Sequence, residues 1–537
     1  MEARARYRTP LANPHGLITG ARFLARVPGF IRDRFTLEQA RAVQADHLRR
    51  RETRFLEFLK RAVFDSHESV LLRLFRHAGI SHPDVEELVA QYGLEGALKT
   101  LFHNGIYVAV DEFKGRKPLV RGSLRLDITP PSLRNPLAAF HVAARSGGSR
   151  SAAAPFLIDL EYIRACAIAF AIYLDAHGGS DWDKATWETP GAGSRFRLLK
   201  CCCFGRRPVA WFTQVDPSAA GLDPVFRWSD RALRWGGLLG GVRVPRPVLA
   251  SPEEPLAVAR WMRGVLDNRK VPHLMSFSSS IVRLATAALD ADIDLTGAYA
   301  TVMGEPTTQT RLDTIRKCGL NALPRYGSIE AGPIGYACRN ADAADDVHVV
   351  RDLQAVITAG SHGTALGMPK NALLLTALHA AAPFTMINFS MGDQADLIER
   401  QCRCPMERLG WGPHLLNIRS YEKLTAGGVT FDDAMITGLL EEVLPQRFGG
   451  NPTDYQLVEQ ESIRGEPALV LRVHPRVGPV SVTEIKRELL AGLGGGPAVN
   501  QLMVHGLQNA VEIRVERSVP LTTRSSKILH LHVNPAS

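Results

Sequence analysis

The chain has no long uninterrupted hydrophobic run. Its richest apolar stretches, residues 165–174 and 373–387, are short or are interrupted by His379 and Pro383, whereas a membrane-spanning helix needs about 18 or more apolar residues. Residues 1–30 alternate arginine with short apolar patches and lack the continuous core of a secretory signal. We therefore expect a cytoplasmic protein without a membrane partner.

Cysteine is scarce and unevenly distributed. Eight cysteines in 537 residues are too few for the disulfide framework of a secreted protein. Three of them, Cys201–Cys203, follow two leucines, and we expect the buried end of a strand there. Because successive strand residues point to opposite faces, three adjacent cysteines make a poor metal site. Core packing is the better interpretation of this triplet.

Acidic residues are fewer than basic ones. Lys and Arg number 64 and Asp and Glu 54, which gives a net charge of +10. The excess is concentrated in residues 1–60, with thirteen basic and six acidic residues. This segment is either a solvated helical face or a surface for an acidic partner such as a nucleotide, CoA or an acidic carrier protein. No motif interleaves aromatic with basic residues, so we expect no nucleic acid.

The remaining composition is that of a folded globular protein, and the length of 537 residues predicts two to four domains. Apolar residues recur at threes and fours over residues 35–64, and further helices are expected at 68–78 and 84–92, so residues 1–100 form a helical N-terminal part of the large domain. From residue 101 to 418, helical segments alternate with short apolar runs, which predicts an α/β core. Those runs are at 209–213, 273–277, 298–303 and 372–378.

The last part of the chain, residues 419–537, predicts a small α+β lid domain. Helical patterns at 431–444 and 482–493 lie among strand patterns at 454–459, 468–473 and 510–515.

Two glycine-containing motifs are suited to a nucleotide. Residues 144–151 include Ser146, Gly147 and Ser149, whose amides and hydroxyls can bind phosphates, although a flexible surface loop has the same composition. The second is the stretch 326–332, which contains Tyr326, Gly327, Ser328 and Glu330. The tyrosine can stack on a purine and the carboxylate can hold Mg²⁺. Gly304 and Glu305 precede this motif, and Asp393 follows it as a candidate for the ribose hydroxyls.

The order of these pieces, completed by Arg419 and by Lys527 near the C-terminus, resembles the adenylate-forming (acyl-CoA synthetase-like) superfamily, and most of all its phenylacetate–CoA ligase branch. The resemblance covers residues 70–530. It implies a large N-terminal domain with β-sheets packed against helices and a small, mobile α+β C-terminal domain. Catalysis would rest on Lys527, Glu330 and Arg419, and ATP would bind at Ser146, Gly147, Ser149, Gly304, Glu305, Tyr326, Gly327, Ser328 and Asp393.

The activity that the resemblance implies has two steps. ATP and a small carboxylic acid, aromatic or compact, give an acyl-adenylate, and a thiol such as that of CoA then displaces AMP. Transfer to a carrier protein or an amine is the alternative. Ile329 stands where the superfamily carries Thr or Ser, and Arg145, Gly148 and Arg150 depart from its phosphate loop, so a catalytically silent homologue is a further alternative. Dimers are common in this branch.

Four residues are candidates for a structural Zn²⁺ site. Cys338, His348, Cys402 and Cys404 have the side chains that a closed tetrahedral zinc site uses. Members of the resembling branch carry a Cys/His cluster at corresponding places. The site would tie together the segments that carry Glu330 and Asp393. The alternative is that Cys338 is a core residue and that Cys402 and Cys404 are loop thiols.

Overall fold

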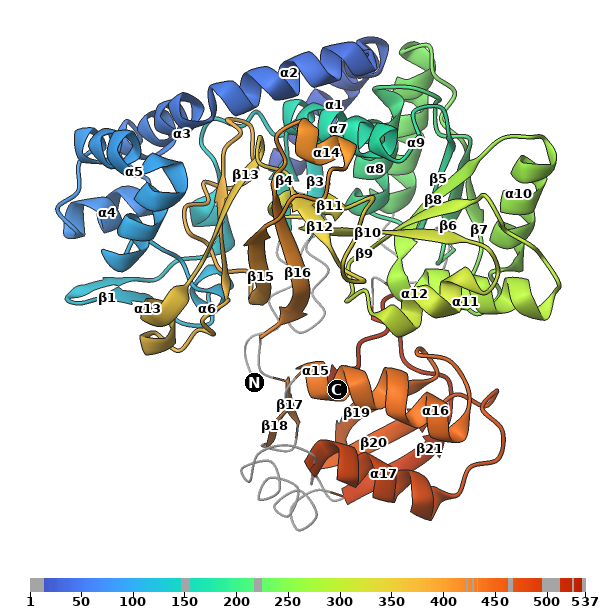
Figure 1. The fold of residues 1–537 in the computed structure, drawn as a ribbon. Coiled ribbons are helices and arrows are strands. Elements are labelled where there is room, and N and C mark those ends of the chain that lie inside the picture. Colours follow the sequence, from blue (N-terminus) through green and yellow to red (C-terminus); the bar gives the residue numbers. More distant parts are fainter. Residues whose placement is uncertain are drawn as a thin grey trace.

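The computed structural model shows a large α/β body with a smaller α+β body beneath it (Figure 1). It describes residues 14–145, 155–216, 225–421, 424–426, 429–431, 433–461, 467–494, 512–523 and 526–533. Within this part of the chain, no helix has the length and apolar character needed to cross a membrane.

Five helices form the beginning of the large body and lie along its upper and left side in Figure 1. They are α1 (Pro14–Arg32), α2 (Leu37–Arg49), α3 (Arg51–Leu59), α4 (Val70–His77) and α5 (His82–His103). Helix α2 begins at the predicted place because the Thr36 hydroxyl accepts from the Gln39 amide and the Gln39 side chain accepts from the Thr36 amide. The apolar faces of these helices share one core with the rest of the large body.

A ten-stranded sheet organises the large body, with strand order β15-β16-β12-β11-β10-β9-β8-β5-β6-β7. Six neighbouring strands, β10-β9-β8-β5-β6-β7, are parallel, and the other four pair antiparallel. Strands β5 and β8 are buried along their whole length, as expected for a parallel sheet covered on both faces. The strands are β5 (Asp183–Glu188), β6 (Ala210–Thr213), β7 (Pro247–Leu249), β8 (Pro272–Phe277), β9 (Tyr299–Met303), β10 (Asn321–Ser328), β11 (Gly332–Ala337), β12 (Val347–Val349), β15 (Asp393–Glu399) and β16 (Pro413–Ser420).

Six longer helices pack around this sheet and connect its strands. They are α7 (Leu160–Ala176), α8 (Ala192–Cys202), α9 (Val225–Leu239), α10 (Leu256–Asp267), α11 (Ser278–Asp290) and α12 (Gln309–Arg316). The shorter α6 (Val110–Phe113), α13 (Gly360–Ala365) and α14 (Pro405–Arg408) lie in connections. Three two-stranded sheets complete the large body: β1 (Leu119–Arg121) with β2 (Leu124–Leu126), β3 (Val142–Arg145) with β4 (Pro155–Ile158), and β13 (Gln354–Thr358) with β14 (Leu373–Ala377).

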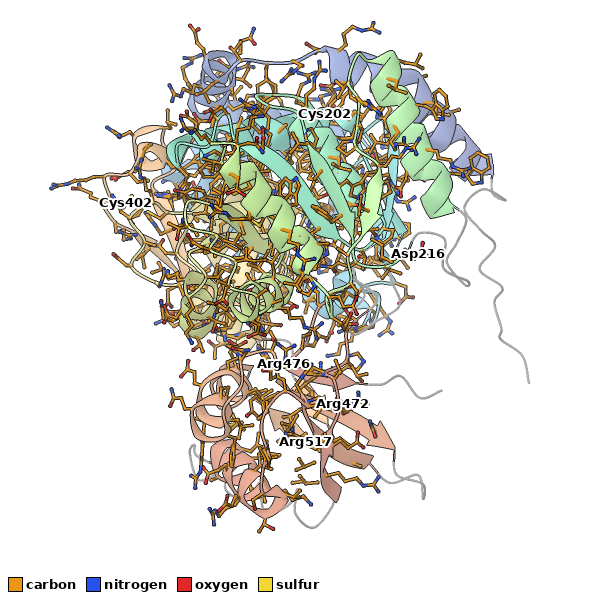
Figure 2. The ribbon with its side chains drawn as sticks, turned by 90° about the vertical axis from the view of Figure 1, so that its right-hand side faces the viewer. Cys202, Asp216, Cys402, Arg472, Arg476 and Arg517 are labelled. Atoms are coloured by element: carbon orange, nitrogen blue, oxygen red, sulfur yellow. The ribbon has the colours of Figure 1, made fainter. Side chains whose placement is uncertain are left out.

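The prediction of a strand end at the cysteine triplet is wrong. Cys201 and Cys202 end helix α8, and Cys203 follows as its cap. Cys202 lies in the upper part of the large body in Figure 2. Phe196, Leu199 and Cys203 recur at threes and fours, which is the period of a helix facing the core. The expectation of core packing is confirmed, because all three thiols are buried.

The smaller body has its own core and confirms the predicted α+β composition. Its sheet has the order β21-β20-β19-β22. The predicted 431–444 helix is instead a broken one, α15 (Asp433–Gly438) and α16 (Leu444–Phe448) joined by a π-helical turn. The other elements are β17 (Leu424–Ala426), β18 (Val429–Phe431), β19 (Tyr455–Glu461), β20 (Pro467–Val473), α17 (Val482–Gly494), β21 (Glu512–Arg517) and β22 (Leu531–Val533).

Candidate active site and metal centre

The candidate active site lies at one edge of the large sheet. Glu188 ends β5, Phe277 ends β8, Gly304 follows β9 and Glu330 follows β10. These four strands run parallel, so their carboxyl ends meet at the same edge, which is the usual place for a ligand in such sheets. The sequence motifs thus come together because of strand direction.

Lys527 reaches this edge from the smaller body. A tight turn holds it: the Lys527 amide donates to Thr523 Oγ1 at 3.1 Å, and the Thr523 amide donates to the Lys527 carbonyl at 2.8 Å. Its ammonium lies 5.4 Å from the centre of the Phe277 ring. A Cβ on Gly304, whose φ is +78°, would lie 3.1 Å from Lys527 Nζ. Glycine at 304 therefore leaves the space that the lysine occupies.

The charges around Lys527 are mixed. Burial, the largest influence, lowers the pKa of Lys527, and Arg197 acts in the same direction, whereas Glu305, Glu330 and Glu188 oppose it. The structure thus brings the predicted pair Lys527 and Glu330 into one electrostatic environment. The nearby carboxylates help the Lys527 ammonium to stay protonated.

Glu188 and Arg197 form a buried ion pair that sequence reasoning missed. Arg197 Nη1 lies 2.8 Å from Glu188 Oε2. Burial raises the pKa of Glu188, although Arg197, Arg325, Lys200 and Lys527 all oppose this shift. Arg197, Arg325, Lys200 and Lys527 thus all favour the ionised form of Glu188, although burial lowers the pKa of Lys200 to about 7. The spacing of Arg197 and Lys200, which places both on one face of a helix, is the signal that could have revealed the cluster.

Glu305 makes four hydrogen bonds to protein groups. Its Oε1 accepts from the Ile528 amide at 2.9 Å and from the Ser279 hydroxyl at 2.9 Å. Its Oε2 accepts from the Ser279 amide at 2.6 Å and from Arg311 Nη1 at 3.3 Å. Because Ile528 directly follows Lys527, Glu305 fixes the backbone that carries the lysine. The predicted contact of Glu305 with nucleotide gains no support from this geometry.

A buried network continues from Glu305 between the two bodies. Arg311 of α12 donates to Glu441 of the smaller body at 2.7 Å, and both side chains are 1% exposed. The Thr308 hydroxyl and His530 Nε2 also donate to the Glu441 carboxylate. Burial opposes ionisation of Glu441, but Arg311 and His530 outweigh it and lower its pKa to about 2. The smaller body is therefore held against the larger one by fully paired charges.

Tyr326 of β10 and Asp393 of β15 are in contact, although three strands separate β10 from β15 in the order of the sheet. The Tyr326 hydroxyl donates to Asp393 Oδ2 at 2.8 Å, and burial, with Asp393 acting in the same direction, holds the tyrosine pKa well above its usual range. Ser328 Oγ accepts from the Ala331 amide at 3.0 Å and so stabilises the turn that carries Glu330. A Cβ on Gly327 would lie 2.3 Å from the Gly332 carbonyl oxygen, so only glycine fits there.

Arg419 and the predicted phosphate loop complete the sequence-based site. Arg419 lies on β16 opposite Gln394, one residue from Asp393 in the sheet. Its guanidinium binds Asp345 at 3.0 Å, a partner that sequence reasoning did not identify. Ser146, Gly147 and Ser149 lie outside the described residues.

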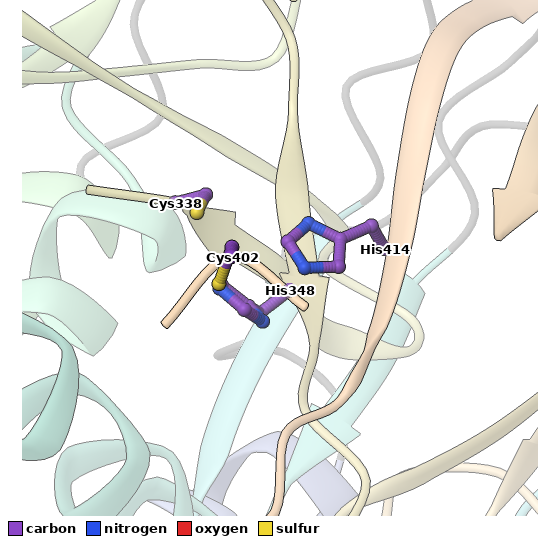
Figure 3. A group of neighbouring side chains, drawn as sticks. All are labelled: Cys338, His348, Cys402 and His414. Atoms are coloured by element: carbon purple, nitrogen blue, oxygen red, sulfur yellow. The ribbon is translucent and has the colours of Figure 1, made fainter. Parts of the chain in front are cut away.

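The predicted cysteine and histidine residues also gather in space. Ligand atoms of Cys338, His348, Cys402 and His414 all lie within 4.8 Å of one another, and all four residues are buried (Figure 3). His414 replaces Cys404 in this group, although Cys404 Sγ lies only 3.0 Å from His348 Nε2. Sequence reasoning missed His414 because this residue joins the cluster only through the pairing of β12 with β16. In that pairing, His348 and His414 are opposite each other.

The hydrogen bonds of the two histidines turn their free nitrogens toward the cluster. His414 Nδ1 donates to Asp346 Oδ1 at 2.7 Å. The buried Nε2 of His414 then carries a lone pair that has no hydrogen-bond partner. His348 Nδ1 donates to the Trp411 carbonyl, and its Nε2 faces the sulfurs of Cys402 and Cys404. A ligating histidine bound through its other nitrogen to a carboxylate or carbonyl is the usual arrangement around Zn²⁺. The residues thus have the donor atoms that a zinc ion uses.

Comparisons with known proteins identify the class of fold. No protein-family model and no curated sequence matches the chain. A structure of 2-hydroxyisobutyryl-CoA ligase with 2-HIB-AMP matches 94% of this chain and 91% of its own, with 13% identity and a TM-score of 0.53. The same ligase with R3-HIB-AMP has 14% identity, the same coverage and a TM-score of 0.51. The amide bond synthetase McbA from Marinactinospora thermotolerans matches 76% of this chain and 70% of its own, with 14% identity and a TM-score of 0.40.

The chain therefore has the fold of an adenylate-forming ligase, as the resemblance implied. More particularly, the likeness in fold to 2-hydroxyisobutyryl-CoA ligase extends over 94% of this chain.

Proposed function

We propose that this protein activates a small carboxylic acid with ATP as an acyl-adenylate and transfers the acyl group to a thiol such as that of CoA. The observation that carries the proposal is the position of Lys527, which the smaller body inserts among Glu330, Glu188 and Arg197 at the sheet edge. The fold supports the same chemistry, since the similar ligase binds 2-HIB-AMP. We further propose an aromatic or compact acid, as in the phenylacetate–CoA ligase branch.

The residues at this edge supply what adenylation requires. A carboxylate is a poor electrophile, and joining it to AMP provides a better leaving group. Lys527 would stabilise the negative charge that develops at the α-phosphate. Glu330 would hold Mg²⁺, which neutralises phosphate charge when bound. Asp393 would bind the ribose, and Tyr326, held by Asp393, would lie against the base.

Glu305 and Arg311 would act as positioning residues in this reaction. Glu305 holds the Ile528 amide, and Arg311 joins Glu305 to Glu441 of the smaller body. Lys527 thus reaches the α-phosphate only while this network is closed. The boundary near residue 419 and the rotation of residues 419–537 between the two half-reactions belong to the same proposal.

Lys527→Ala tests the function directly. With a panel of acids, the wild-type protein should release pyrophosphate for at least one acid, and the variant should lose this step while retaining most thioester formation from preformed acyl-adenylate. Lys370→Ala, on an exposed loop of the large body, is the control. Equal loss in both half-reactions would contradict a dedicated adenylation role. A wild-type protein that releases no pyrophosphate with any acid would favour a silent homologue, and activity only with a carrier protein or an amine would favour that acceptor.

We also propose a structural Zn²⁺ held by Cys338, His348, Cys402 and His414, with Cys404 beside it. What supports this proposal is the buried, unpartnered Nε2 of His414 together with the sulfurs around His348 Nε2. Four protein ligands leave no open position, so the metal would stabilise the sheet that carries Asp393 and take no part in the chemistry.

A further inference from the structure

Helix α9 presents an apolar face that no described residue covers. Trp228 is 59% exposed, Trp235 65%, Leu238 54% and Leu239 67%. Their spacing places them on one side of the helix. On the other side, a Cβ on Gly236 would lie 2.1 Å from Val27 of α1. The glycine lets α1 and α9 pack closely, while both tryptophans stay exposed.

The surroundings of this face are basic. Helix α1 carries Arg22, Arg26 and Arg32 as exposed residues and has no acidic residue. The segment 240–249, which follows α9, adds exposed Arg243 and Arg246, also without an acidic residue. Arg32 Nη2 donates to the Leu239 carbonyl at 2.8 Å, so the two helices belong to one surface. We call the exposed residues of α1, α9 and 240–249 the α1–α9 surface.

The acidic residue of α9 does not reduce this positive charge on the outside. Asp230 is 5% exposed and lies 3.6 Å from the buried Arg195. Arg231 is exposed and lies over the Trp228 ring, 5.3 Å from its centre. Two more apolar residues, Val248 and Leu249 of the edge strand β7, are also exposed. The surface thus combines a tryptophan- and leucine-rich centre with arginines around it.

The charge decides what can cover this surface. A second copy of the chain would place arginines against arginines, and like charges disfavour such a contact. We propose that the α1–α9 surface binds an anionic lipid membrane, with Trp228, Trp235 and Leu238 entering the interface and the arginines contacting the headgroups. Such attachment needs no spanning helix. This proposal departs from the sequence-based expectation of no membrane partner, which rested on the lack of a long apolar run.

Vesicle co-sedimentation tests this proposal with the full-length protein. Wild-type protein should sediment with vesicles of equal parts phosphatidylcholine and phosphatidylglycerol and remain in solution with phosphatidylcholine alone. The double variant Trp228→Ser, Trp235→Ser should bind the anionic vesicles at least tenfold more weakly, and Arg243→Gln with Arg246→Gln should weaken binding to a smaller extent. Tyr92→Ser, which changes an exposed aromatic of α5, is the matched control and should bind like wild type.

Two further measurements separate the outcomes. Pyrophosphate release in the absence of vesicles should be the same in wild type and the tryptophan variant, since the surface does not include the active site. The melting temperature of the variant should also be unchanged, because both tryptophans are exposed. Absence of binding to anionic vesicles, or equal binding by the tryptophan variant, would overturn the proposal. A dimer in light scattering that the tryptophan variant abolishes would assign the surface to a second copy.

Discussion

Two buried polar clusters of this protein differ in how their groups are satisfied. Between the bodies, each charged side chain of Glu305, Arg311 and Glu441 has an opposite charge within 3.3 Å. In the cysteine–histidine cluster, His414 Nε2 has no donor and His348 Nε2 faces sulfur. The first cluster is complete without a ligand, whereas the second gathers lone pairs that a cation would satisfy. Burial alone therefore does not distinguish a structural network from a binding site; the balance of donors and acceptors does.

The clusters also differ in what they join. The charged network takes side chains from both bodies, so relative motion would break it. The cysteine–histidine cluster lies on β12, β16 and adjoining segments of one sheet, where such motion would leave it intact. The charged network is therefore suited to control the closure of the two bodies. The cysteine–histidine cluster is suited to hold neighbouring segments of the large sheet in place.

Removal of the zinc ligands should have the largest effect. Cys402→Ser with Cys404→Ser should abolish the binding of about one zinc per chain and lower the melting temperature. Elemental analysis and thermal unfolding of tag-free protein measure both. Cys318→Ser, a buried cysteine outside the cluster, should retain the zinc. The zinc proposal would be contradicted if the wild-type protein contained no metal and had the same melting temperature as the double variant.

The charged network is tested by Arg311→Met. This change leaves Glu305 and Glu441 buried without their partner, and breaking a buried ion pair costs about 3–5 kcal/mol. We expect a loss of pyrophosphate release of roughly 100-fold or more, with little effect on thioester formation from preformed acyl-adenylate. Arg316→Met on the same helix, which removes an exposed ion pair to Asp313, is the control. A parallel loss in both half-reactions would indicate misfolding instead of failed closure, and full activity would contradict a positioning role.

A milder change tests the residue that holds a zinc ligand in place and leaves the ligand itself unchanged. Asp346→Asn weakens the hold on His414 Nδ1 without removing a ligand, and loss of such a supporting group typically costs 10–100-fold in metal affinity. Competition with a chromogenic chelator measures the change. Arg400 pairs with both Asp346 and the exposed Asp342, so Asp342→Asn is the control and should leave zinc affinity unchanged. If both variants bind zinc like wild type, His414 is not a ligand.

The smallest expected effect concerns pH. Burial lowers the pKa of Lys527 from its ordinary value of 10.5, and adenylation needs the protonated ammonium. As pH rises through this lowered pKa, the lysine becomes neutral, so kcat/KM for pyrophosphate release should fall at a pH below 10.5. Thioester formation from preformed adenylate should not show this alkaline limb. An alkaline limb at or above pH 10.5 would contradict the inferred environment of Lys527.

Local patterns in the sequence predicted much of the fold. The apolar runs at 273–277 and 298–303 located β8 and β9, and the helical period over residues 35–64 located α2 and α3. The cysteine triplet misled because a thiol packs like a small apolar residue in either a helix or a strand. The order of the motifs predicted that Lys527 and Glu330 belong to one site. The parallel direction of the strands then places Glu330 at the sheet edge that Lys527 reaches.

Long-range pairing explains what the sequence could not reveal. His414 joins His348 through the register of β12 and β16, and nothing in the sequence near either residue specifies that register. Glu441 meets Arg311 only because one body folds against the other. Charged residues so far apart carry no common periodicity, so each alone is indistinguishable from a solvated surface residue.

The charged contact between the bodies has a consequence for opening. An apolar contact of the same size would resist separation, because its surfaces gain nothing from water. When Arg311 leaves Glu441, water can hydrate both ions, and this hydration offsets most of the lost attraction. The closed and open arrangements can then have similar free energies, so small changes shift their populations. Dissolved salt, which screens the ions once they are exposed, becomes one such influence, and the protein should open more readily as ionic strength rises.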